Sequence, residues 1–419
     1  MNLNIINKLS LLTNELEKFG KLSIVDNENY FFDEPNLYTY SLVLEPHFKY
    51  KNKEFTHFPI GSITATGQSF FDKELALLKG VSECIERTCL YIFPRNVITG
   101  KYKEVGQSVL EPENYGIDHA KQSFDWVQGE NLTSEKKCLI PAQLIYLGYG
   151  INTETRLTCQ NSTGAACANT RDAAILRGIY EVIERDAFMC VYLNRITVPK
   201  IEITSITDDD VLSILQLLSQ YNLTLELFNI TNDFNIPTIL SVIFDNSFFG
   251  PNVTVGIKTD RSIKRAIIGS IEEAVVRRVT IRGMMQRNEL KEKVYKVENI
   301  VERASYWFLP GMVKHLNFLY DSNKIEPFNG DLSDAQTEDD LDEIITKMKR
   351  LGFSIYATCI SDGKISSKDC VVYKTIIPGL QPLFQSERER IVNKKRIKDV
   401  SLFFKKRTLK INTIPHPFI

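Results

Sequence analysis

Residues 161–188 read NSTGAACANTRDAAILRGIYEVIERDAF, a small polar segment followed by a long helical pattern. The octet GIYEVIER at 178–185 repeats an earlier octet, GVSECIER at 80–87, with the glycine, both glutamates, the isoleucine and the arginine in the same places. If both copies are helical, each places two carboxylates on one face, with Cβ atoms about 5–6 Å apart. A chance repeat and a solvated helix face, where E-x-x-E-R is common, are the alternatives.

The repeat supplies four candidate metal ligands: Glu83, Glu86, Glu181 and Glu184. Four carboxylates on two buried helices repel one another unless cations lie between them. Oxygen-only ligand sets of this kind suit Mg²⁺, which usually completes its shell with water and substrate phosphates. The pattern therefore favours a magnesium-nucleotide site.

Composition narrows the class of protein. The 419 residues are 43% hydrophobic and 25% charged, with a formal net charge of −1. There is thus no general basic field for nucleic acid or anionic lipid. No apolar run approaches the roughly 20 residues that span a bilayer, and the N-terminus lacks the pattern of a signal peptide. A cytoplasmic protein with reduced, buried thiols is the expectation, since its eight cysteines form no C-x-x-C pair.

Hydrophobic periodicity predicts helices and strands in mixed order. Helices are expected over 4–19, 72–91, 170–193, 207–221, 262–284 and 337–351. Strands are expected over 38–46, 137–148, 224–229, 237–244, 252–257, 353–360 and 369–377. Without regular βαβ alternation, this order predicts an α+β fold of antiparallel sheets packed with helices. No G-x-G-x-x-G or Walker loop occurs, so carboxylate-bound metal and cationic side chains would have to hold a nucleotide.

Several charged or polar residues flank the glutamates. Lys79 lies one turn before Glu83 and pairs with it or with a phosphate. Asn169 is a helix cap or a ligand contact. Arg277 and Arg278 suit a triphosphate, although a solvated face shared with Arg265 and Arg282 is the alternative. The loop 67–69 is predicted as an ordinary turn, with backbone amides for a phosphate as the second interpretation.

Together these motifs resemble the YcaO family. The stretch 161–188 looks like its central signature, with Asn169, Glu181, Glu184 and Arg185 at matching positions. ECIER at 83–87 and IEEAVVRR at 271–278 resemble the first and third acidic motifs. The resemblance covers roughly residues 60–385. It implies an ATP-dependent enzyme that activates a backbone amide, with ATP and Mg²⁺ as cofactors.

The same resemblance assigns roles to individual residues. Glu83, Glu86, Glu181 and Glu184 would bind Mg²⁺ ions that bridge the nucleotide phosphates. The residues that would contact ATP are Asn169, Arg185 and Arg278, with Lys79 and Arg277 as further candidates. Lys79 departs from the family pattern, which often has serine there. Lys8 and Ser10 are the candidates for the N-terminal nucleotide contacts.

The C-terminus, PHPFI at 415–419, is similar to the proline-rich end of YcaO cyclodehydratases that make azoline rings. Ile419 replaces the last proline, so the match is partial, and a stiff structural end is the alternative. PGLQPLFQ at 378–385 also looks like that subgroup. The resemblance implies that this tail reaches toward the active site, where His416 and the carboxylate of Ile419 would assist proton transfer.

The implied reaction converts Cys, Ser or Thr of a ribosomal precursor peptide to thiazoline or oxazoline. Thioamide formation, amidine formation, an ATP-dependent ligase and a non-catalytic ATP-binding subunit are the alternatives. A leader-binding E1-like partner is expected, with a flavin-dependent azoline dehydrogenase and a homodimer as further possibilities. The predicted division is an N-terminal region (1–58), a YcaO domain (59–385) and a basic segment with the tail (386–419). For the basic run 388–398, a solvated helix is favoured over a helix that docks a partner.

Overall fold

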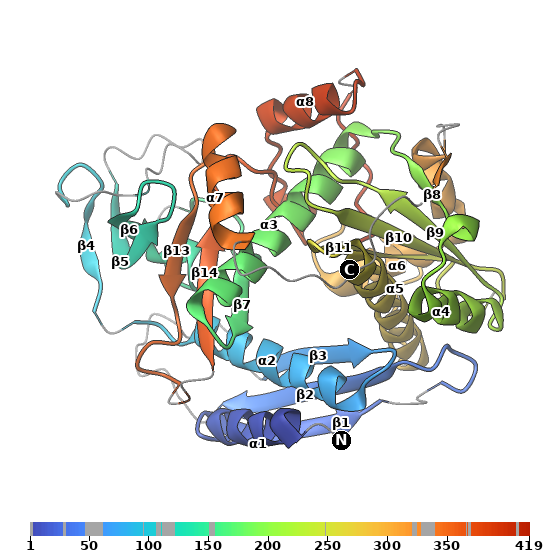
Figure 1. Cartoon of the computed structure of the whole chain (residues 1–419), viewed down its shortest axis with the longest axis horizontal. Coiled ribbons are helices and arrows are strands. Elements are labelled where there is room, and N and C mark those ends of the chain that lie inside the picture. The colour runs from blue at the N-terminus through green and yellow to red at the C-terminus, as the bar shows by residue number, and fades with distance from the viewer. Residues whose placement is uncertain are drawn as a thin grey trace. The chain divides into compact units, whose positions relative to one another are not determined.

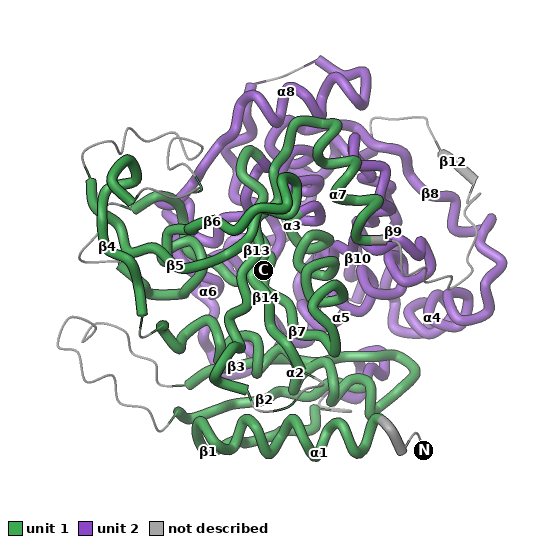
Figure 2. Tube along the Cα trace, turned by 60° about the vertical axis from the view of Figure 1, so that its left-hand side comes forward, with its two compact units in different colours: residues 1–27, 38–182, 338–379 green, residues 28–37, 183–337, 380–419 purple. Residues whose placement is uncertain are grey.

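The computed structural model describes most of the chain. The described residues are 3–27, 31–46, 62–94, 96–105, 110, 122–150, 156–247, 249–320, 325–327, 340–365, 367, 370–407 and 410–419. The chain forms two compact units, coloured separately in Figure 2. Unit 1 comprises residues 1–27, 38–182 and 338–379, and unit 2 comprises residues 28–37, 183–337 and 380–419.

The first sheet of unit 1 has the antiparallel order β1 (Gly20–Asp26), β2 (Tyr38–Pro46), β3 (Ile63–Ser69). Helices α1 (Leu3–Glu17) and α2 (Lys73–Tyr91) pack on it, as Figure 1 shows. Asp72 caps α2 by accepting the backbone N–H of Leu75 at 2.8 Å, which fixes the start of the predicted helix.

Strand β3 replaces the loop that was predicted at 67–69, and that prediction is wrong. Ile63, Ala65 and Ser69 are buried on alternate positions of the strand, the period that a sheet with one covered face requires. Gly67 lies directly against α2, where a Cβ atom would be 2.0 Å from the carbonyl oxygen of Ala76. The glycine is therefore required for close helix–strand packing rather than for a turn.

The second sheet of unit 1 has the order β4 (Ile98–Lys101), β5 (Ser123–Asn131), β13 (Tyr356–Cys359), β14 (Val371–Ile376), β7 (Ala165–Ala168). Strand β6 (Lys136–Pro141) pairs with β5, and all these pairings are antiparallel. A short 3-10 turn, Ala142–Leu144, follows β6, and helix α7 (Asp340–Arg350) also belongs to this unit. Strand β7 was not predicted, because its sequence Ala-Ala-Cys-Ala lacks the β-branched and aromatic residues typical of strands. Its conformation is fixed by pairing with β14.

Helix α3 (Arg171–Asn194) begins in unit 1 and ends in unit 2. Thr170 accepts the backbone N–H of Ala173 at 3.3 Å, so Thr170 is the cap of this helix. The predicted helix over 170–193 is confirmed within a residue of each end.

The sheet of unit 2 has the order β11 (Val253–Thr259), β10 (Thr238–Asp245), β9 (Leu223–Asn229), β8 (Lys200–Glu202), β12 (Ile325–Pro327). Only the β8–β12 pairing among these described strands is parallel. Helix α4 (Asp209–Ser219) packs on β9 and helix α5 (Ile263–Gln286) on β10 and β11. A Cβ at Gly256 of β11 would lie 2.0 Å from the carbonyl oxygen of Ser270, so α5 approaches the sheet at backbone distance.

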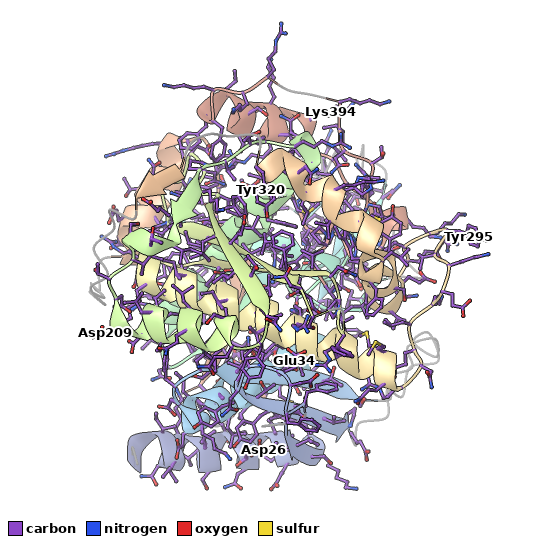
Figure 3. The ribbon with its side chains drawn as sticks, turned by 90° about the vertical axis from the view of Figure 1, so that its right-hand side faces the viewer. Asp26, Glu34, Asp209, Tyr295, Tyr320 and Lys394 are labelled. Atoms are coloured by element: carbon purple, nitrogen blue, oxygen red, sulfur yellow. The ribbon has the colours of Figure 1, made fainter. Side chains whose placement is uncertain are left out.

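The remaining elements of unit 2 are α6 (Ile300–Phe308), α8 (Lys394–Phe403) and the 3-10 segments Ile203–Ser205, Pro310–Leu319 and Glu387–Glu389. The basic segment was expected to be a solvated helix. Lys394, labelled in Figure 3, is exposed, but Arg396 is 2% exposed and bonded to Asp186 and Asp233. The expectation is wrong for this face of α8, because charge pattern alone does not reveal a buried acidic partner.

Two further expectations concern the whole chain. All eight cysteines are free thiols and seven of them are buried, which confirms the reduced state expected for them. In the described residues no helix is long and apolar enough to cross a membrane. The predicted boundary at 58/59 lies outside the described residues, and the boundary at 385/386 stays a prediction.

Candidate functional site

Three of the predicted metal ligands form an acid cluster in unit 1: Glu83 and Glu86 on α2, and Glu181 on α3. Burial, followed by the negative charges of Glu181 and Glu83, raises the pKa of Glu86 well above its usual value. The three carboxylates are thus close enough for their charges to act on one another. Three of the four glutamates of the repeated octet thus lie near one another, and their role as metal ligands stays a prediction.

The surroundings of the acid cluster fix two of its carboxylates. The Glu83 carboxylate accepts the backbone N–H of Thr66 at 2.8 Å and pairs with Arg87 at 2.5 Å. The Glu181 carboxylate accepts the backbone N–H of Gly164 at 3.0 Å. Strand β3 therefore orients Glu83, and the turn at Gly164 orients Glu181.

The donor set of the acid cluster fits Mg²⁺. It is made of carboxylate oxygens, the ligands that Mg²⁺ prefers, and the pKa of Glu86 is raised by burial and then by the charges of Glu181 and Glu83. No three His, Cys, Asp or Glu side chains among the described residues are arranged to hold an ion by themselves. Mg²⁺ is usually bound by one or two carboxylates together with water and phosphate oxygens.

Lys8 and Lys79, two candidates for nucleotide contacts in unit 1, each donate a hydrogen bond. The Lys8 ammonium donates a hydrogen bond to the side-chain carbonyl of Asn169, so the N-terminal candidate meets the central motif. Ser10 accepts the Thr13 hydroxyl through its backbone carbonyl at 3.1 Å. Lys79 donates to the carbonyl oxygen of Gln68 at 2.9 Å. Because Thr170 caps α3, Asn169 is not needed as the cap.

The fourth glutamate, Glu184, belongs to unit 2 and is buried. Its carboxylate accepts the backbone N–H of Thr259 at 2.9 Å and lies 3.5 Å from the Arg185 guanidinium. Burial raises the pKa of Glu184 to about 7, opposed by the charges of Lys258 and Arg185. This carboxylate is thus poised between its charged and neutral forms near neutral pH.

The two predicted arginines of α5 differ in their surroundings. Arg278 is 2% exposed and donates to Glu34 at 2.7 Å and to Asp245 at 3.0 Å; Glu34 is labelled in Figure 3. Arg277 contacts Glu273 at 3.4 Å. Arg282 is also buried and pairs with Asp33 at 2.8 Å and with Glu34. The solvated-face alternative is therefore wrong for Arg278 and Arg282.

The C-terminal tail is anchored within unit 2. The carbonyl oxygen of Pro415 accepts hydrogen bonds from Tyr192 at 3.0 Å and Trp307 at 2.9 Å. The His416 ring is bonded to the carbonyl oxygen of Phe384 at 2.8 Å, and Arg303 donates to the His416 carbonyl oxygen at 2.8 Å. Burial, and then the charge of Arg303, lowers the pKa of His416 well below its usual value, so this ring is neutral.

The last two residues of the tail meet predicted site residues and the core. The Phe418 ring lies 4.4 Å from the Arg185 guanidinium and 5.8 Å from that of Arg277, distances at which cation–π attraction operates. Ile419 is buried in an apolar cluster with Ile281, Met284 and Ala304. The catalytic roles predicted for His416 and Ile419 stay predictions.

Sequence reasoning did not find Lys374, Glu34 or Phe418 as site neighbours. Lys374 lies on β14 and its pKa responds to the charges of Glu181 and Glu86. No spacing rule links a strand lysine to acids on helices about 190 to 290 positions earlier. Phe418 could have been singled out as the aromatic residue of the C-terminal motif, but the sequence does not predict its contacts with Arg185 and Arg277.

Comparison with known proteins gives the family. The family model described as YcaO cyclodehydratase, ATP- and Mg²⁺-binding, matches residues 69–381. The chain belongs to the YcaO family. An uncharacterized protein of Methanothermobacter thermautotrophicus is 27% identical over 292 residues, covering 67% of this chain and 72% of its own length. A protein of Rhizobium leguminosarum bv. trifolii, described as uncharacterized and in the tfuA 3′ region, is 23% identical over 242 residues, covering 54% and 57%.

Several solved structures share the fold. A heterocyclase in complex with substrate and cofactor gives a TM-score of 0.77 at 16% identity, covering 98% of this chain and 57% of that one. YcaO from Methanopyrus kandleri, bound with AMPPCP and Mg²⁺, gives 0.65 at 14% identity, covering 90% and 91%. The E. coli microcin synthetase McbBCD complex gives 0.57 at 14% identity, covering 86% and 88%. The predicted YcaO-type α+β fold is confirmed. This YcaO chain spans little more than half of the first heterocyclase.

Proposed function

We propose that this YcaO protein is an ATP-dependent cyclodehydratase that converts Cys, Ser or Thr of a ribosomal precursor peptide to thiazoline or oxazoline. The observation that carries the proposal is the acid cluster. Glu86 is placed beside Glu83 and Glu181, and burial together with their two negative charges raises the pKa of Glu86 well above its usual value. A protein keeps such a costly arrangement where a cation completes it.

The proposed metal ligands are Glu83, Glu86, Glu181 and Glu184. When bound there, Mg²⁺ would neutralise the charge of the nucleotide phosphates and orient the γ-phosphoryl group. Asn169, Arg185, Arg277, Arg278, Lys79 and Lys8 are the proposed polar contacts to ATP. The backbone N–H groups of Thr66 and Gly164 hold Glu83 and Glu181 in place, which reduces the reorganisation needed when ligand arrives.

The proposed reaction needs no side-chain nucleophile from the enzyme. The peptide thiol or hydroxyl attacks the preceding backbone carbonyl, and the resulting oxyanion takes the γ-phosphoryl group of ATP. Phosphate then leaves with that oxygen as the nitrogen lone pair forms the C=N bond of the azoline. Two protons are released in the course of the reaction, one from the attacking group and one from the amide nitrogen. Positioning and charge stabilisation carry most of the catalysis in phosphoryl transfer.

The tail is proposed to set the geometry of the reacting peptide. Its anchoring through Pro415 and His416 holds Phe418 against Arg185 and Arg277. The terminal carboxylate of Ile419 is the proposed proton acceptor. The neutral, buried state of His416 suits an anchoring role alongside the proton transfer predicted for it.

The proposed partners follow from the same family. A solved neighbour is a complex of several proteins, and a related structure carries the pro-MccB17 peptide. We propose that an E1-like protein presents the leader of the precursor peptide to this chain. A flavin-dependent dehydrogenase would oxidise azolines afterwards.

The test is the intact mass of a candidate precursor peptide after incubation with this protein, its partner and Mg-ATP. A loss of about 18 Da per ring, dependent on ATP as phosphoryl transfer requires, is the expected result. A gain of about 16 Da in the presence of sulfide, from exchange of oxygen for sulfur on the same activated amide, would replace cyclodehydration by thioamidation. Joining of a second molecule would indicate a ligase. An absence of ATP binding would overturn the nucleotide site itself.

A further inference from the structure

We infer that Lys374 is a positioning residue for the acid cluster, acting through the turn that holds Glu181. This inference rests on the proposed Mg-nucleotide site and deepens it. Lys374 lies on β14, is 3% exposed and pairs in register with Ala165 of β7. An ammonium group so deeply buried is costly unless it is hydrogen-bonded and has a counter-charge.

The Lys374 ammonium is bound to two carbonyl oxygens of one short segment. It donates to Asn161 at 2.9 Å and to Thr163 at 2.6 Å. The next residue, Gly164, donates its N–H to the Glu181 carboxylate at 3.0 Å. One lysine thus holds the carbonyls of the residues three and one positions before Gly164, whose amide orients a proposed metal ligand.

The neighbouring residue on β14 holds the other side of the same turn. The backbone N–H of Thr375 donates to the Gly164 carbonyl oxygen at 2.7 Å. Gly164 has φ +85°, and a Cβ there would lie 2.2 Å from the Thr375 carbonyl oxygen. Replacing Gly164 by another residue, or breaking its bond to Thr375, would therefore move the backbone N–H that donates to Glu181.

Charge adds a second reason for the location. Burial lowers the pKa of Lys374 to about 8, and the charges of Glu181 and Glu86 oppose that shift. The lysine is thus electrostatically coupled to two members of the acid cluster. Its hydrogen bonds define where Glu181 points, while its charge offsets part of the repulsion between the carboxylates.

Lys364 provides a matched control in the same unit. Its ammonium also donates to two backbone carbonyls, of Ile92 at 2.6 Å and Cys89 at 3.5 Å. Its charge is coupled to the Cys89 and Cys359 thiols rather than to the acid cluster. Replacing either lysine by methionine removes an ammonium that donates to two backbone carbonyls, buried at Lys374 and half-buried at Lys364, but only Lys374 holds the Glu181 turn.

The experiment titrates Mg²⁺ against binding of the β,γ-methylene analogue of ATP, measured by calorimetry, for wild type and variants. Lys374→Met should raise the half-saturating Mg²⁺ concentration by about 10- to 100-fold, the usual cost of losing a residue that orients a metal ligand. Lys374→Arg should recover part of the loss, and Lys364→Met should bind as wild type. Thermal unfolding of each variant shows that it is folded.

Three outcomes would overturn the inference. If folded Lys374→Met needs the same Mg²⁺ concentration as wild type, Lys374 has only a structural role. If the variant needs less Mg²⁺, the lysine charge repels the cation rather than positioning its ligands. Equal loss in Lys364→Met would reduce the effect to general destabilisation. Failure of wild type to bind the analogue with Mg²⁺ would instead contradict the proposed function. Failure of the Lys374 inference can therefore be told apart from failure of the proposed function.

Discussion

The acid cluster of unit 1 is built from half-buried carboxylates and the Arg396 network of unit 2 from a buried guanidinium and its acids, and their charges are balanced differently. In the Arg396 network, the guanidinium donates to Asp186 at 2.7 Å and to Asp233 at 2.7 Å. Asp186 also accepts Asn232 at 3.0 Å and the Gln381 N–H at 2.8 Å. Every partner finds a complementary group, and the pKa of Arg396 is raised by these acids despite burial.

The acid cluster lacks that balance. Glu83 has Arg87, but Glu86 has its pKa raised by burial and by two neighbouring acids. Buried acids matched by an opposite charge are structural, whereas neighbouring acids that raise the pKa of one another suit the binding of a cation. The contrast predicts that substitutions in the two regions fail in different assays.

The largest effect is expected from Arg396→Met. The substitution leaves Asp186 buried without its counter-charge, which typically costs about 3–5 kcal/mol. Chemical denaturation should show this loss of unfolding free energy, while Lys398→Met, at an exposed position of the same helix, should change it little. A loss below about 0.5 kcal/mol, the range of ordinary surface substitutions, would remove the Arg396 network from the comparison.

The next effect is expected from Glu181→Gln. ATP turnover should fall by at least about 100-fold, because an oxygen ligand that stabilises phosphoryl transfer is lost, while the melting temperature should not fall. Glu184→Gln should behave in the same way. Asp172→Asn, at an exposed position of the same helix, is the control and should retain turnover. Near-normal turnover in both glutamine variants would refute the metal assignment.

The smallest effect concerns pH and the tail. The pKa of His416 is lowered in the folded state, so the unfolded chain binds a proton below about pH 6.5 that the folded chain does not. Wild type should therefore lose up to about 1.4 kcal/mol per pH unit below that value relative to His416→Gln. The difference between the two proteins is the quantity to measure, since Glu184, with its pKa raised to about 7, contributes the opposite slope to both. Parallel pH profiles would contradict the neutral, buried ring.

The sequence was a good guide where function depends on short-range spacing. The repeated E-x-x-E-R pattern predicted helices α2 and α3 and the spacing of two acids on each, because helix periodicity is a local property. The amphipathic pattern of α4 was equally readable.

What could not be predicted depends on partners far apart in the chain. Strand β7 is defined by its pairing with β14, about 200 residues later. Arg278 was expected to face solvent or a triphosphate, and only the fold brings it to Glu34 and Asp245. Lys374 likewise acquires its meaning from the turn at Gly164. Burial and counter-charge are tertiary properties, so sequence periodicity does not report them.

The most direct test of the account is a comparison of wild type with Glu86→Gln in thermal unfolding, with and without Mg-ATP. The account predicts that Glu86→Gln melts at a higher temperature than wild type in the absence of ligand, because a carboxylate repelled by two neighbouring acids is removed. It also predicts that Mg-ATP raises the melting temperature of wild type but not of the variant. A variant that is no more stable alone and is stabilised by Mg-ATP as much as wild type would contradict the claim that the acid cluster is the magnesium-nucleotide site.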